Sequence, residues 1–173
     1  MKITNPLFSL ILIAVLLIGG MVFYYREKRH KNTPQNPPIP ASQSTGLIIQ
    51  AYERLVTLAE RIGFKSLISR FPTGSLSTVE LGEVLKEAIR NEFEFNLSQQ
   101  IYVSEKSWIA LSDLKDQQLF IVDQLMNALP KEATGKDLQE AMLSYLNADQ
   151  NASMQSIVLE TLRYEARQII INS

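Results

Sequence analysis

Residues 75–89, SLSTVELGEVLKEAI, hold the clearest helix start in the sequence. Ser77 is followed three positions later by Glu80, which is the pattern of a capping box. Leu76 and Leu81 stand on either side of it as a hydrophobic staple. The apolar residues of the helix that follows recur at helical spacing: Leu81, Val84, Leu85, Ala88 and Ile89. We therefore expect a helix that begins after Ser77 and buries this face.

The same period continues on both sides of this stretch. We expect further helices over 48–62, 104–129, 134–146 and 154–169. Their apolar stripes include Tyr52, Leu55 and Ala59 in the first, Leu111, Leu114, Ile121, Val122 and Leu125 in the second, Leu138 and Met142 in the third, and Val158 and Leu162 in the last. Ser104 and Thr134 stand at N-cap positions, and Pro130 ends the helix before Thr134. The first helix is expected to end in a Schellman motif at Gly63-Phe64. No alternating strand pattern of useful length occurs, so the sequence predicts an all-α bundle of about five helices.

The N-terminal part of the chain has a different composition. Residues 7–25, LFSLILIAVLLIGGMVFYY, are 19 residues without a charge, enough to span the roughly 30 Å core of a bilayer as a helix. No small-residue cleavage site follows, which favours an uncleaved anchor over a signal peptide. Residues 32–45 contain four prolines and no charge, as expected of a stiff linker. The expected domains are an anchor with a basic flank at 1–31, a proline-rich linker at 32–45 and a soluble helical domain at 46–173.

Charge indicates an orientation and argues against one class of partner. Four basic residues follow the apolar stretch, so the positive-inside rule places the soluble domain in the cytoplasm. Residues 46–173 carry 12 basic and 17 acidic side chains, a net charge of −5. Binding to nucleic acid depends on neutralising phosphates with Lys and Arg, so no nucleic-acid partner is expected.

Residue types that carry catalysis are scarce. The chain has no cysteine, and its one histidine, His30, lies in the basic flank of the apolar stretch. No phosphate-binding or dinucleotide-binding glycine motif occurs. We therefore expect no enzyme activity, no catalytic residue, no cofactor and no metal site.

Two stretches are candidates for a partner surface. Tyr52-Glu53-Arg54-Leu55 is echoed seven residues later by Ala59-Glu60-Arg61-Ile62, so like charges share helix stripes that could select a partner helix. The simpler interpretation is a solvated charged face. Residues 92–103 mix acids, amides and aromatics between two helices. They favour either a recognition patch or a corner whose aromatics bury while its amides and serine cap the helix ends. The candidate residues are Glu53, Arg54, Glu60, Arg61, Glu92, Glu94, Asn96, Gln99, Gln100 and Tyr102.

These two stretches also carry a family resemblance. IQAYERLVTLAERI (49–62) and EFEFNLSQQIYVS (92–104) resemble an uncharacterised bacterial family of small, single-pass, membrane-anchored helical proteins. The resemblance covers nearly the whole chain and implies a location at the bacterial inner membrane. It implies no activity and no site residue. Gly63-Phe64 departs from the pattern, since a proline-containing turn is expected there.

The sequence therefore favours a membrane-tethered, non-enzymatic interaction or scaffold module with a protein partner. The alternative is a helical domain that binds a small molecule or lipid between its helices, with carboxylate-based catalysis. Self-association through the first helix is a third hypothesis.

Overall fold

The structure is a computed structural model that describes residues 45–148 and 153–171. The chain divides into two units, residues 1–40 and 41–173, and all the described residues belong to the second. Within the described ranges it contains six α-helices and one 3₁₀-helix, η1. They are α2 (Thr45–Arg61), α3 (Phe64–Arg70), α4 (Thr78–Phe95), η1 (Leu97–Ile101), α5 (Glu105–Ala128), α6 (Gly135–Ala148) and α7 (Met154–Ile171).

The all-helical prediction is confirmed, but the predicted architecture is wrong in its elements. The described part has six α-helices where about five were expected, because α3 forms after Gly63. Across 45–148 and 153–171, none of the helices combines the length and apolar character needed to cross a membrane. The stretch 7–25, on which the transmembrane helix was predicted, lies outside the described residues. Thr45, predicted to end the linker, is the first residue of α2.

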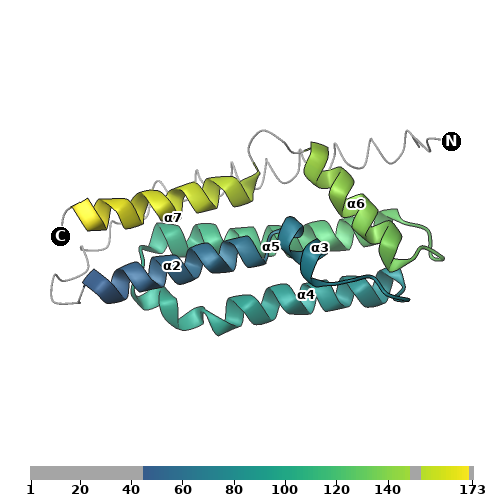
Figure 1. The fold of residues 1–173 in the computed structure, drawn as a ribbon, viewed down its shortest axis with the longest axis horizontal. Helices are drawn as coiled ribbons and strands as arrows, with labels where there is room; N and C mark the ends of the chain where they lie inside the picture. The colour runs from purple at the N-terminus through teal and green to yellow at the C-terminus, as the bar shows by residue number, and fades with distance from the viewer. Residues whose placement is uncertain (1–44, 149–152, 172–173) are drawn as a thin grey trace. The chain divides into compact units, whose positions relative to one another are not determined.

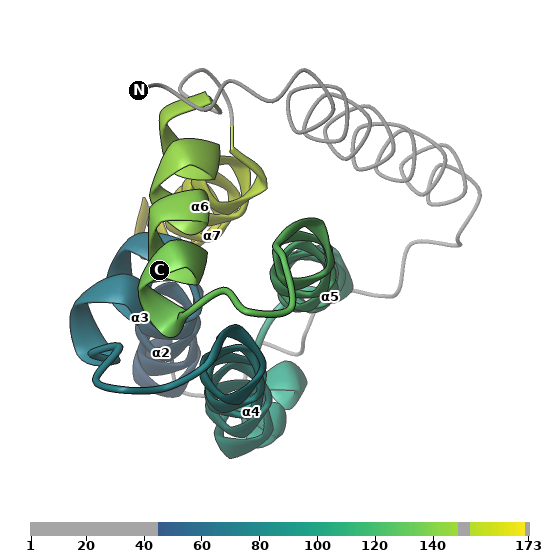
Figure 2. The ribbon, with the colours of Figure 1, turned by 90° about the vertical axis from the view of Figure 1, so that its right-hand side faces the viewer.

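Four long helices lie side by side, and two shorter ones pack at one end of them (Figure 1). α7 packs against α2 and α5, and α4 packs against α5. α6 packs against α4, α3 and α5, and the end-on view shows it beside α3 (Figure 2). The fully buried side chains are mostly leucines from the predicted apolar stripes, such as Leu55, Leu85, Leu111 and Leu138.

The helix starts at α4 and α6 are built alike. Ser77 Oγ accepts the N–H of Glu80 at 3.3 Å, and the Glu80 carboxylate accepts the N–H of Ser77 at 2.8 Å. This confirms the capping box. Thr134 and Asp137 repeat the arrangement, with 2.7 Å between the Thr134 nitrogen and the Asp137 carboxylate. The hydrogen bond from the Ser77 backbone N–H holds the pKa of the Glu80 carboxyl below its usual value. The hydrogen bond from the Thr134 hydroxyl does the same for the pKa of Asp137.

An isolated antiparallel bridge between Ser77 and Thr134 ties these two starts together. The N–H of Gly135 donates to the carbonyl of Leu76 at 2.8 Å. A Cβ at position 135 would lie 3.1 Å from that same oxygen, so glycine permits the close approach. The bridge fixes α6 beside α4, at the end of the bundle where α3 also packs.

The Schellman motif expected at Gly63 is wrong. Gly63 has φ −69° and ψ 145°, an extended conformation rather than the left-handed one that the motif requires. It is the N-cap of α3, and Phe64 continues into that helix and packs edge-to-face on Tyr145 at 5.7 Å. A Cβ at position 63 would collide with the side chain of Gln155, which donates to the Ala59 carbonyl at 3.1 Å. Glycine at position 63 therefore leaves room for the α7 side chain that contacts the end of α2.

Candidate functional site

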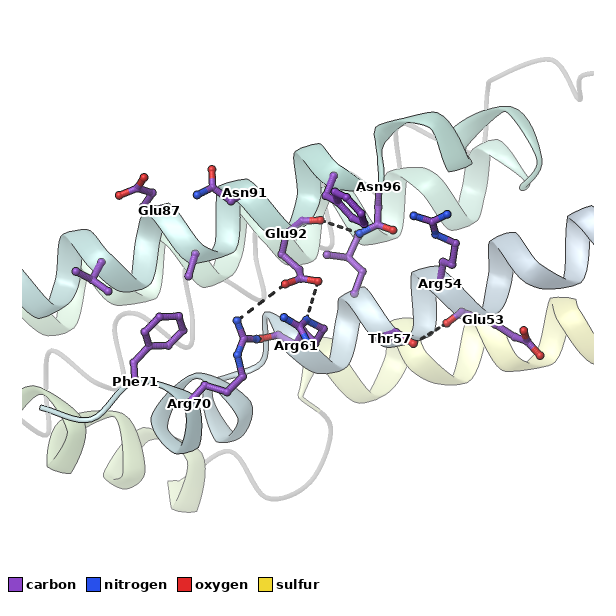
Figure 3. Close-up of a pocket in the computed structure, with 14 residues that line it drawn as sticks. Glu53, Arg54, Thr57, Arg61, Arg70, Phe71, Glu87, Asn91, Glu92 and Asn96 are labelled. Carbon is purple, nitrogen blue, oxygen red and sulfur yellow. Dashed lines mark hydrogen bonds and ion pairs between the residues drawn. The ribbon is translucent and has the colours of Figure 1, made fainter.

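A surface groove of about 830 Å³ separates α2 from α4 (Figure 3). It forms because α2 packs closely on α7 and α4 on α5, whereas α2 and α4 touch each other at few points. Three arginines, three glutamates and several apolar or amide side chains line it. They are Glu53, Arg54, Thr57, Leu58, Arg61, Arg70, Phe71, Val84, Glu87, Ala88, Asn91, Glu92, Phe95 and Asn96.

The α4 wall is a second stripe of that helix, separate from its core face. Val84, Ala88, Asn91 and Phe95 follow one another at spacings of four, three and four and line the groove. Val84 is 39% exposed, and Ala88 is half-buried. The prediction that Val84 and Ala88 share the buried face is therefore wrong. The buried face lies further round the helix, at Leu81, Leu85, Ile89 and Phe93.

An ion pair crosses the groove at the α3 end. The Nε of Arg61 lies 2.7 Å from the Glu92 carboxylate, and Arg70 lies 3.9 Å from its other oxygen (Figure 3). Arg70 also donates to the Arg61 carbonyl at 3.0 Å. Side chains of Glu92 and Arg61 are 17% and 47% exposed, so the glutamate is sheltered and the arginine is open to solvent.

An aromatic contact lies across the other end. The Arg54 guanidinium sits 5.6 Å from the centre of the Phe95 ring, within cation–π range. Phe95 is 74% exposed, although the capping interpretation of this corner expected its aromatics to bury. Phe93 fits that expectation, since it is buried and packs on Trp108 at 5.1 Å. Asn96 also fits it, because its side chain donates to the Glu92 carbonyl at 2.8 Å.

The groove brings together half of the residues that the sequence nominated: Glu53, Arg54, Arg61, Glu92 and Asn96. The others lie elsewhere. Glu60 pairs with Arg163 of α7 at 3.1 Å, and Gln99 is buried with its amide on the Ser98 hydroxyl. Glu94 and Gln100 are exposed outside the groove lining, and Tyr102 is half-buried.

Sequence reasoning missed the α3 and α4 parts of the lining. Arg70 and Phe71 reach the groove because α3 forms directly after α2 and packs on α2 and α6, which no local pattern indicated. Glu87 could have been found from its spacing, because it stands seven residues, or about two helical turns, before the nominated Glu94 on α4.

A separate polar cluster joins α7 to α2 and α5. One carboxylate oxygen of Glu165 accepts hydrogen bonds from Tyr52 at 2.8 Å, Ser104 at 2.6 Å and Ser107 at 2.7 Å. Tyr52 also accepts the Ser104 N–H at 3.2 Å, and burial raises its pKa to about 12. Ser107 is fully buried, whereas Ser104 and Glu165 are half-buried. The cluster joins three helices by hydrogen bonds, and no pattern in the sequence indicated Glu165.

Lys86 forms a second unexpected tie. Its side chain is 10% exposed, and its ammonium lies 2.7 Å from Asp123 of α5 and 2.8 Å from Glu83. The hydrogen bond to Asp123 raises the pKa of Lys86, so the charged form is favoured. Among residues 45–148 and 153–171, no group of three or more His, Cys, Asp or Glu side chains is arranged to hold a metal ion.

These features define a class: an all-helical domain with a charged surface groove. The chain belongs to the family of unknown function DUF7935, whose model matches residues 1–169. The match confirms an uncharacterised family over nearly the whole chain, whereas membrane anchoring and bacterial origin stay predictions from the sequence. No curated protein and no solved structure matches the chain.

Proposed function

We propose that this protein is a non-enzymatic interaction module and that a protein partner binds in the groove between α2 and α4. The observation that carries the proposal is Phe95, a phenylalanine 74% exposed on the groove wall. Exposed apolar side chains that gather in one region mark interaction sites, and Phe95 is followed by the exposed Leu97 and Ile101. Aromatic and arginine side chains are enriched at the centres of protein interfaces, and Arg54 and Arg61 stand opposite this wall.

The neighbouring corner extends the same surface. Leu97 and Ile101 of η1 are 41% and 62% exposed, and η1 begins two residues after Phe95. The groove and this corner offer apolar contacts surrounded by charges, which is the usual anatomy of an interface with a polar rim.

The small-molecule or lipid hypothesis is supported only by volume, because about 830 Å³ lies within the range of ligand pockets. Such pockets enclose most of the ligand. The groove has six charged side chains in its lining and lies on the surface. These properties suit a polypeptide better than a buried ligand. Binding there would use only the described helices, and the location at a bacterial inner membrane stays a separate prediction.

Photo-crosslinking in cells tests the proposal. The full chain is made with a benzoyl-phenylalanine at position 95 and, as a matched control, at position 164. Tyr164 is an aromatic of α7 with 61% exposure and no part in the groove lining. We expect a discrete protein adduct from position 95 and none from position 164.

Substitutions within the first sequence signature sharpen the test. Arg54→Ala and Arg61→Ala in the position-95 protein should weaken the adduct, because both arginines line the groove. Glu60→Ala should leave it unchanged, because Glu60 faces α7 and pairs with Arg163. The same adducts from positions 95 and 164, or none from position 95, would contradict the proposal.

A further inference from the structure

The groove stripe of α4 has the spacing of a helix-packing seam. Val84, Ala88, Asn91 and Phe95 alternate steps of four and three, the pattern with which one helix packs along another in a coiled coil. α4 already buries a full apolar face in its own core, at Leu81, Leu85, Ile89 and Phe93. The second stripe is therefore additional to what the fold of this domain requires.

Charged rows with seven-residue spacing border this seam on both sides. On α4, Glu87 and Glu94 are seven residues apart and exposed. On α2, Arg54 and Arg61 are also seven residues apart, exposed, and line the opposite wall. Within the described helices neither Glu87 nor Glu94 makes an ion pair. Charged positions that flank an apolar seam select partner and orientation in packed helices.

We infer that the groove takes one amphipathic helix of a partner protein, with an apolar 3–4 seam on the Val84–Phe95 stripe. The edge of that helix facing α2 is acidic and meets Arg54 and the exposed side of the Arg61 guanidinium, whose Nε stays on Glu92. The edge facing α4 is basic and meets Glu87 and Glu94. This inference rests on the proposed function and adds the form and the charge pattern of the partner.

The two charged rows have a specific physical consequence. A helix lying on a surface can be turned end for end, and this rotation exchanges its two edges. A partner helix with one acidic and one basic edge can therefore always match the groove in one direction. The rows consequently decide the direction of the bound helix, and they disfavour any helix whose two edges carry the same charge.

Peptide binding to the full chain tests this inference. The probe is a helical peptide of about five turns, with leucines at 4–3 spacing, glutamates along one edge and lysines along the other. A second peptide has the edges exchanged. Two controls keep the leucines but carry glutamate, or lysine, along both edges. Fluorescence anisotropy at low salt compares their affinities, because screening weakens exposed charge pairs.

Both mixed peptides should bind with similar affinity, and each single-sign control should bind about tenfold more weakly, or about 1.4 kcal/mol. A nitroxide at the N-terminus of one mixed peptide should broaden amide signals near Phe95. With the edges exchanged it should broaden signals near Phe71, at the opposite end of the groove. Ala88→Glu should weaken both mixed peptides, and so should Phe95→Ala, whose exposed side chain makes the substitution safe for folding.

Several results would overturn the inference. They are equal affinity of single-sign and mixed peptides, the same nitroxide position for both edge arrangements, and binding that Ala88→Glu and Phe95→Ala leave intact. Self-association of the full chain that Ala88→Glu abolishes would assign the face to a second copy instead. A cellular adduct at position 95 without peptide discrimination would leave the proposed function standing and remove only the helical partner. No adduct and no peptide binding would remove both.

Discussion

The two sides of α2 are built differently. Toward α7 and α5, α2 presents a buried seam in which Tyr52 is 3% exposed and shares the Glu165 carboxylate with two serines. Toward α4, it presents an open seam bridged by a half-exposed arginine on Glu92 and by Arg54 over Phe95. α2 therefore has a closed seam, where it packs on α7 and α5, and an open seam, where it faces α4.

The difference teaches where stability and binding reside. Hydrogen bonds from buried hydroxyls such as those of Tyr52 and Ser107 are costly to lose, because each donor is left without an acceptor away from water. Ion pairs open to solvent contribute little to stability, typically below about 1 kcal/mol. The closed seam should therefore respond to mutation as a structural core, and the open seam should tolerate change without unfolding.

The largest effect is expected at Glu165. Glu165→Ala leaves the hydroxyls of Tyr52, Ser104 and Ser107 without their shared acceptor, which should lower the free energy of unfolding by about 3 kcal/mol. Urea denaturation followed by circular dichroism measures the change. Glu160→Ala, an exposed glutamate on the same helix, is the control and should be nearly neutral. Equal effects of the two substitutions would show that the closed seam is not held by this cluster.

Tyr52→Phe should cost less, about 2 kcal/mol, because it removes one hydroxyl and leaves Glu165 with two donors. It should also change the response to alkali. The pKa of Tyr52 is raised to about 12 from 10.0, so its stabilising contribution is complete below pH 10 and is lost as the pH rises toward 12. Wild-type protein should lose stability over this interval more steeply than Tyr52→Phe. Tyr164→Phe, at an exposed tyrosine, should keep the wild-type slope.

Ser77→Ala removes the cap that starts α4 and should cost about 1 kcal/mol. The effect should depend on pH, because the pKa of Glu80 is lowered by its hydrogen bonds to Ser77. That contribution is present above the ordinary glutamate pKa of 4.5 and is lost as the pH falls through the lower folded value. The difference in the free energy of unfolding between wild type and Ser77→Ala should therefore become smaller in acid. A difference that stays constant down to low pH would mean that protonation of Glu80 does not weaken the capping box.

The smallest effect is expected on the open seam. Arg61→Ala should change stability by less than about 1 kcal/mol, since its side chain is 47% exposed. A double-mutant cycle with Glu92→Ala isolates the pair, and its coupling should be similarly small. A coupling as large as the loss in Glu165→Ala would mean that the open seam is a structural closure instead of a binding groove.

Local patterns predicted the helix starts well. Ser77, Ser104 and Thr134 all cap helices as expected, because a capping residue and its partner three positions later interact within one turn. The apolar stripes of α2 and α5 were predicted correctly for the same reason, since helical period decides which side chains share a face. Half of the candidate surface residues were also brought together in one groove.

The errors arose where distant segments decide the outcome. Gly63 was assigned a left-handed ending because glycine often adopts one, but the approach of Gln155 explains it better. Val84 and Ala88 were placed in the core because the period of α4 accommodates two adjacent apolar stripes. Only the separation of α2 from α4 shows which stripe is left uncovered.

The sequence by itself determined the helical class, the capped starts and most of the apolar faces, because these depend on residues within a few turns of one another. The tertiary structure decided which of those faces are paired. It brought Glu165 onto Tyr52 across 113 residues and left Phe95 in the open. The physical reason is that a helix carries its periodicity locally, whereas the burial of any one face depends on the other helices that pack against it.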